Sequence, residues 1–263
     1  ERGVREEREG GGAVRVLVWT GHAGPFHDHF ANGKILAEAL NTTGNTVTEL
    51  ACSVNETTPC EAAFTKDNLA RFDVLLIYAD TYESPDHGSL TDAQWEALLG
   101  FVSNGGGLFA LHTASACWDA MADRPTDERS RYFHVHVLNA VFGGHSPYKD
   151  YISHIATPND DPITYGLGDY VVSDELYHPV VFNASRSTVF LTAYDPGLCG
   201  PDCVNATAVH GLRHDYGDGR VLYFAQGHDA AEFDNPETGY GNYAFQTIVR
   251  RSLLWLARRQ TEV

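Results

Sequence analysis

The chain has 263 residues and a formal net charge of −17, from 18 basic and 35 acidic side chains. This length allows one large hydrophobic core, and the acidic balance excludes the clustered Lys and Arg that binding to nucleic acid needs. No run of 18 or more apolar residues occurs, so we expect no membrane span and no membrane partner.

The first half of the chain has the pattern of alternating strands and helices. Residues 1–12 are expected to form a disordered leader because seven of them are charged, and residues 13–263 are expected to form a single domain. The predicted strands cover Val14–Trp19, Thr46–Ala51, Phe72–Ala79 and Gly107–Leu111, and the predicted helices cover Phe30–Leu40 and Thr91–Val102. Thr91 and Gln94 have the spacing of a capping box. Strands alternating with helices predict a right-handed parallel α/β sheet.

The second half contains strands with few helices between them. These predicted strands cover Tyr151–Ala156, Tyr170–Ser173, Thr188–Tyr194, Ala206–His214 and Val221–Ala225. The turn residues of Asp215–Gly219 predict a hairpin that joins the last two strands. Apolar residues at helical spacing predict a closing helix over Asn242–Arg259.

Cysteines and glycosylation sequons predict a secreted, extracellular protein. Two pairs, Cys52 with Cys60 and Cys199 with Cys203, are spaced so that each can close a short disulfide loop, which leaves Cys117 over. Sequons begin at Asn41, Asn55, Asn183 and Asn205. Metal binding by Cys199 and Cys203 is the alternative, but one pair supplies only two ligands. Since residues 1–12 have no apolar signal sequence, we expect a processed chain.

Histidines follow three of the predicted strands. His27 comes after the first strand, His112 directly follows Gly107–Leu111, and His228 follows the last strand. Ligands of parallel α/β sheets bind beyond the carboxyl ends of the strands, so these rings are expected at one edge together with Glu175. Imidazole and carboxylate groups suit a divalent metal, of which zinc fits best. The alternative is that these side chains cap strands or form hydrogen bonds without a metal.

Further polar and aromatic residues are candidates for moving protons and for holding a sugar. The candidate acids and bases are Asp28, His145, Asp174 and Tyr177. The candidate surfaces for stacking against sugar rings are Tyr82, Trp118 and Tyr148, although for each one an ordinary half-buried aromatic is the alternative.

Four segments resemble the trehalose-utilisation (ThuA-like) family: GGGLFALHTAS, VFGGHSPY, SDELYH and YGDGRVLYFAQGHD. The resemblance runs from about Val14 to Ala257. It implies a class I glutamine-amidotransferase-like, flavodoxin-like three-layer sandwich, with a mostly parallel central sheet and antiparallel strands added in the C-terminal half. The positions that carry over are His27, Asp28, His112, His145, Asp174, Glu175, His228 and Asp229. Amidotransferases of this fold have a Cys nucleophile where this chain has His112, so glutamine hydrolysis is not expected.

Together these patterns predict a secreted metal-dependent enzyme that acts on a carbohydrate. A bound zinc-type ion would activate a sugar oxygen or water, and a glycoside or polysaccharide would be cleaved or modified by hydrolysis or β-elimination. One alternative is a noncatalytic sugar-binding module on an enzyme-like fold. Another is a Ser- or Cys-dependent hydrolase that uses Ser115 or Cys117.

Overall fold

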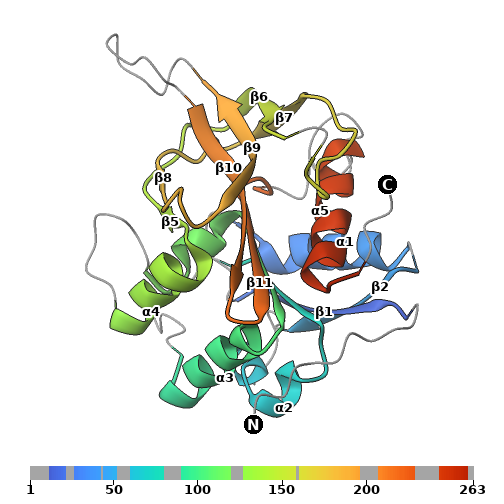
Figure 1. The fold of residues 1–263 in the computed structure, drawn as a ribbon, viewed down its shortest axis with the longest axis vertical. Helices are drawn as coiled ribbons and strands as arrows, with labels where there is room; N and C mark the ends of the chain where they lie inside the picture. Colours follow the sequence, from blue (N-terminus) through green and yellow to red (C-terminus); the bar gives the residue numbers. More distant parts are fainter. Residues whose placement is uncertain are drawn as a thin grey trace.

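A mixed sheet of nine strands runs through the protein in the order β2-β1-β3-β4-β11-β10-β9-β6-β7 (Figure 1). The computed structural model describes residues 12–21, 27–42, 44–51, 60–79, 90–119, 127–157, 160–195, 207–228 and 243–259. The strands of the sheet are β1 (Val14–Trp19), β2 (Thr46–Ala51), β3 (Val74–Ile77), β4 (Gly107–Leu111), β6 (Lys149–Ile155), β7 (Tyr170–Asp174), β9 (Thr188–Tyr194), β10 (Thr207–Tyr216) and β11 (Gly219–Phe224). A separate antiparallel pair consists of β5 (Val141–Phe142) and β8 (Val180–Val181).

Five neighbouring strands, β2, β1, β3, β4 and β11, are parallel. Every residue of β3 and β4 is buried, as expected of strands that helices cover on both faces. Val74 pairs with Gly107, which in turn pairs with Arg220, so the carboxyl ends of β3, β4 and β11 reach the same edge. This register brings the segments after these strands together.

The remaining four strands, β10, β9, β6 and β7, are antiparallel. The predicted hairpin joins β10 to β11, and its turn contains Gly217 with a φ of +59°. A Cβ atom on Gly217 would lie 2.6 Å from the carbonyl oxygen of Ser103, so both the backbone conformation and the space favour glycine there. The predicted fold class, a mostly parallel sheet with antiparallel strands added in the C-terminal half, is confirmed.

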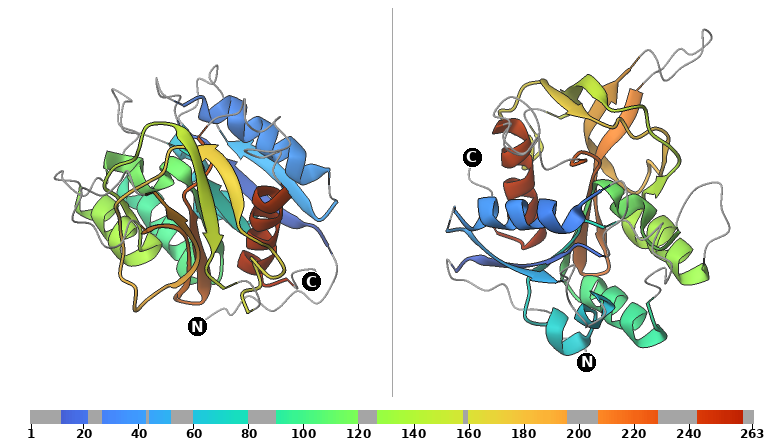
Figure 2. Two further views of the ribbon diagram at one scale, coloured as in Figure 1. Left: turned by 90° about the horizontal axis from the view of Figure 1, so that it is seen from above. Right: turned by 180° about the vertical axis from the view of Figure 1, so that it is seen from behind.

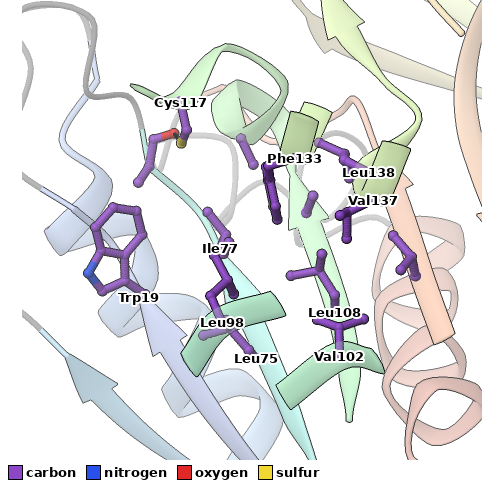
Figure 3. Packing of buried hydrophobic residues seen from close by; sticks show 14 of the residues in the cluster. Trp19, Leu75, Ile77, Leu98, Val102, Leu108, Cys117, Phe133, Val137 and Leu138 are labelled. Carbon is purple, nitrogen blue, oxygen red and sulfur yellow. Dashed lines mark hydrogen bonds between the residues drawn. The ribbon is translucent and has the colours of Figure 1, made fainter. Parts of the chain in front are cut away.

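Helices cover both faces of the sheet and complete three layers (Figure 2). One face is covered by α1 (His29–Asn41) and α5 (Tyr243–Leu256), and the other by α2 (Lys66–Leu69), α3 (Asp92–Ser103) and α4 (Glu128–Tyr132). On the second face, Leu98 and Val102 of α3 pack with Trp19, Ile77 and Phe133 in a continuous apolar core (Figure 3). Burial of these side chains is the main force that holds the layers together.

The chain between β4 and β5 differs from a simple helix. After β4 a 3₁₀ segment, η2 (His112–Asp119), is broken at Cys117 and Trp118, and Trp118 has a φ of +54°. Beyond it, α4 continues into a π-helical segment, η3 (Phe133–Leu138). Elsewhere, between β2 and α2, the chain forms another 3₁₀ turn, η1 (Cys60–Ala63). The type and bounds of these segments were not predicted, because they are too short to show a clear hydrophobic period.

Several predictions fall outside the residues that the structure describes. They concern nearly all of the leader, the cysteines Cys52, Cys199 and Cys203, the sequons at Asn55 and Asn205, the stacking residue Tyr82, and Asp229. Cys117 is a buried thiol whose sulfur lies 2.6 Å from the carbonyl oxygen of Ala79. Among the described residues, no helix has the length and apolar character to cross a membrane.

Candidate metal centre

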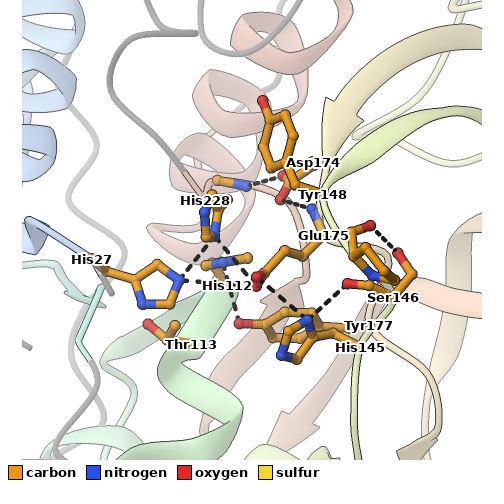
Figure 4. A network of polar contacts seen from close by, with 12 residues as sticks. His27, His112, Thr113, His145, Ser146, Tyr148, Asp174, Glu175, Tyr177 and His228 are labelled. Carbon is orange, nitrogen blue, oxygen red and sulfur yellow. Dashed lines mark hydrogen bonds and ion pairs between the residues drawn. The ribbon is translucent and has the colours of Figure 1, made fainter. Parts of the chain in front are cut away.

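His27, His112, Glu175 and His228 lie together beyond the carboxyl ends of the parallel strands (Figure 4). One nitrogen or oxygen atom from each side chain lies within 4.8 Å of the other three. His27 Nε2 is 2.9 Å from His228 Nδ1, and Glu175 Oε2 is 3.3 Å from the same His228 atom. The structure thus brings together all four side chains selected from the sequence, and this group can hold a metal ion.

His112 stands at a sharp turn directly after β4. Its φ is +49°, and its fully buried ring places Nδ1 2.7 Å from the carbonyl oxygen of Ala225. A carbonyl oxygen only accepts, so Nδ1 carries the hydrogen and the lone pair of the ring is on Nε2. Tyr177 donates its hydroxyl to this Nε2 atom across 3.2 Å. The backbone therefore fixes the tautomer that a metal ligand needs.

A fourth histidine, His29, lies behind the three of the cluster and was not selected from the sequence. Its ring is fully buried, stacks on His27 with 5.1 Å between ring centroids, and meets Tyr78 edge to face. His29 Nε2 is 2.8 Å from Thr113 Oγ1. The sequence feature that could have identified His29 is Asp28. As the N-cap of α1, it places His29 in the first turn of that helix.

His112 of the cluster and His29 behind it are held in the neutral form. Burial lowers the pKa of His29 and of His112 well below the ordinary value, and charge on His27 and His228 lowers both further. Neutral imidazole is the form that binds metal, so the interior suits the ligand role of His112.

Glu175 is held in the charged form. Burial by itself raises the pKa of Glu175, but the hydrogen bond and charge of His228, with the charges of His145 and His27, outweigh it. The net effect is a pKa below the usual range, so the cluster combines three imidazoles with one carboxylate.

The part of the chain that contains these residues matches the model of a known protein family. The family model for ThuA, described as trehalose utilisation, matches residues 15–256. The chain belongs to the ThuA family. The predicted resemblance is thereby confirmed, and the match includes every residue of the four-ligand cluster.

Solved structures with the same fold include two ThuA-like proteins and a glycosidase. The ThuA-like protein of Parabacteroides merdae is 18% identical with a TM-score of 0.72, and the match covers 95% of this chain and 92% of that one. The ThuA-like protein of Bacteroides uniformis is 18% identical with a TM-score of 0.65, covering 92% and 90%. A β-galactosidase from Bacillus circulans is 11% identical with a TM-score of 0.55, covering 95% of this chain and 32% of that one. No curated protein matches the chain.

The candidate acids and bases of this ThuA-family protein occupy different environments. Asp28 is exposed, and its carboxylate accepts a hydrogen bond from the Ala31 backbone, which makes it the N-cap of α1. His145 is partly exposed beside the cluster, with Nδ1 3.3 Å from Glu175 Oε1. Tyr177 is buried against His112.

Asp174 is buried behind the cluster. Its two carboxylate oxygens accept hydrogen bonds from the backbone N–H groups of Glu175 and Gly227, at 2.7 and 2.6 Å. Burial raises the pKa of Asp174 to about 7, against the opposing effect of these backbone donors. Both oxygens are thus engaged by the protein itself.

The aromatic candidates separate into one at the site and one in the core. Tyr148 is 42% exposed, and its ring centroid lies 5.3 Å from that of His228. Trp118 is 4% exposed and stacks on Trp19 within the core, so the expectation that it forms a sugar-stacking surface is wrong. Its indole serves the packing of η2 against α3, where it meets Trp95 edge to face.

The two candidate nucleophiles have buried surroundings. Ser115 Oγ is 3.0 Å from the hydroxyl of Tyr223, and Cys117 lies against the backbone of Ala79. Both side chains are completely buried. These positions are typical of structural side chains and lend no support to a Ser- or Cys-dependent hydrolase.

Proposed function

We propose that this ThuA-family protein is a metal-dependent enzyme that cleaves or modifies a glycoside or polysaccharide, by hydrolysis or β-elimination. The observation that carries the proposal is the group of four ligand atoms within 4.8 Å. The description of the family as trehalose utilisation supports a sugar as substrate.

The metal in this proposal is a divalent ion, with zinc as the best fit. Three imidazoles and one carboxylate form a donor set that zinc and related transition metals accept. Such an ion would polarise a sugar oxygen or a bound water. The lone pair that the Ala225 carbonyl leaves on His112 Nε2 supports this use of the site.

Two side chains next to the ligands are suited to moving protons in this reaction. His145 lies beside Glu175, and its ring is partly exposed, so it can exchange protons with solvent. Tyr177 holds its hydroxyl at His112 Nε2. The exposed ring of Tyr148, which lies beside His228, supports a sugar-stacking role next to the ligands (Figure 4).

Metal analysis of the purified full chain tests the proposal. We expect about one equivalent of a transition metal in the wild type and in His154→Ala, whose exposed ring pairs with Asp169. We expect none in the double variant His112→Ala/His228→Ala. A metal-free wild type, or a double variant that keeps its ion, would contradict the proposal.

An activity screen then separates the chemistries. Anionic and neutral polysaccharides are incubated with the protein, with and without chelator, and new reducing ends are measured together with the ultraviolet absorbance of unsaturated uronic acids. Reducing ends alone indicate hydrolysis, and absorbance indicates elimination. Sugar binding that survives chelation without turnover would instead favour a noncatalytic sugar-binding module.

We also propose that the protein is extracellular and glycosylated. Asn41 and Asn183, the first residues of two sequons, are both exposed, which supports the proposal. Enzymatic removal of N-glycans from the protein isolated from its natural source should lower its apparent mass. An unchanged mass would count against this part of the proposal.

A further inference from the structure

The backbone that presents His228 has an unusual conformation. His228 follows β11 through a short irregular segment, and Gly227 within it has a φ of +128°. Such a backbone has no regular strand or helix to hold it, so its position depends on groups from elsewhere in the protein. Both polar atoms of the Gly227 residue have such partners.

Asp174 holds the backbone on one side. One of its oxygens accepts from Gly227 N and the other from Glu175 N, so a single carboxylate binds the main chains that carry two of the four candidate ligands. Those ligands, Glu175 and His228, face each other at 3.3 Å. Their separation is therefore coupled to the position of Asp174.

Tyr78 and Asn32 hold the same turn on the other side. The hydroxyl of Tyr78 donates to the Gly227 carbonyl oxygen across 2.5 Å, and Asn32 Nδ2 donates to that hydroxyl across 3.0 Å. Asn32 Nδ2 also lies 3.5 Å from the His228 carbonyl oxygen. Both side chains are buried, at 0% and 2% exposure, and Asn32 belongs to α1, the helix that begins beside His27.

We propose that Asp174, Tyr78 and Asn32 are positioning residues that set the affinity of the site for its metal through the Gly227 peptide. This inference rests on the proposed metal-dependent function. It replaces the role of Asp174 as an acid or base, because both of its oxygens are occupied by backbone donors. Residues that orient ligands from behind change metal affinity by about 10- to 100-fold when they are replaced.

The test uses variants that keep all four candidate ligands. Tyr78→Phe removes only the hydroxyl, and Asp174→Asn leaves one acceptor for two backbone donors. Tyr223→Phe is the matched control, because it removes a buried hydroxyl that contacts Ser115 and is not bonded to the turn. We expect zinc affinity, measured by competition with a chromophoric chelator, to fall about 10-fold or more in the first two and to stay unchanged in the control.

Amide hydrogen exchange of the metal-free full chain separates this inference from the proposed function. Peptides that cover residues 225–228 should exchange roughly five- to tenfold faster in Tyr78→Phe than in the wild type or Tyr223→Phe, since one buried hydrogen bond is lost. Unchanged exchange in both Tyr78→Phe and Asp174→Asn would overturn the inference even if the wild type binds metal. A wild type that binds no metal would overturn the proposed function, while exchange still decides whether these residues hold the turn.

Discussion

At the scale of single residues, His112 combines a strained backbone with a ligand position. Its φ of +49° lies in the left-handed region, which costs an L-residue about 1–2 kcal/mol. The hydrogen bond from Nδ1 to the Ala225 carbonyl oxygen helps to keep the ring in place. Strain of this kind persists at functional sites because the turn delivers the side chain to the edge of the sheet.

The strain at His112 can be measured by comparing two substitutions. Both His112→Gly and His112→Ala remove the ring, but glycine adopts positive φ without the steric cost. We expect His112→Gly to be more stable than His112→Ala by about 1 kcal/mol in urea unfolding with chelator present.

Thr113 is the matched control, because it is the next residue and its φ is not positive. There the order should reverse, with Thr113→Gly less stable than Thr113→Ala. An alanine variant at position 112 that is as stable as the glycine variant would show that the left-handed turn carries no strain.

At the scale of elements, α3 is stabilised by signals that are local in the sequence. Thr91 caps its first turn, and Gln94 Oε1 accepts a hydrogen bond from the Thr91 backbone N–H, as the spacing predicts. The helix then buries Leu98 and Val102 against the sheet (Figure 3). Trp95 of the same helix is buried in this core as well. The capping residues and the spacing of the apolar residues indicate a helix over the same segment, which is why this helix was predictable.

Removing the cap of α3 should destabilise the protein by a small, defined amount. We expect Thr91→Ala to lower the free energy of unfolding by about 1 kcal/mol, measured by urea denaturation. Asp127 precedes α4 but makes no capping hydrogen bond with its side chain, so Asp127→Ala should change stability by less than about 0.5 kcal/mol. Equal losses in the two variants would contradict the capping argument.

The difference between local and long-range interactions explains how much of this fold and site the sequence predicts. Strands such as Val14–Trp19 and Gly107–Leu111 were predictable to the residue because their apolar runs are local. The position of β11 between β4 and β10 was not, because strand order depends on long-range pairing. His27, His112 and His228 were found through the rule that parallel strands end at one edge. Tyr78 and Asn32 were missed because their role depends on contacts with a turn about 150 and 196 residues away.

At the scale of the whole molecule, buried histidines make stability depend on pH. Burial lowers the pKa of His134 to about 4 and that of His210 to about 3. Below about pH 6.5 the unfolded chain protonates these histidines while the folded protein does not, so acid favours unfolding by about 1.4 kcal/mol per pH unit for each. Asp174, whose pKa of about 7 is raised, acts in the opposite direction, but it is one group against several.

We therefore expect the metal-free protein to lose at least about 2 kcal/mol of stability between pH 6.5 and pH 5. Urea unfolding at both values, with chelator present, measures this difference. His210→Gln should make the pH dependence shallower, because one such histidine is removed. Thr91→Ala should be less stable at both values with an unchanged pH dependence. A stability that rises toward pH 5 would refute the argument.

The candidate metal centre can form only at a late stage of folding, because its ligands come from distant parts of the chain. His27 and His228 are 201 residues apart in the sequence and 2.9 Å apart in space. His228 reaches the site only after β11 has inserted between β4 and β10, long after His27 has been synthesised. A growing or truncated chain therefore presents an incomplete set of ligands and competes poorly for metal. On the proposed metal-dependent function, ion loading therefore follows the folding of β11, and a bound ion would mark a chain in which all four ligands have come together.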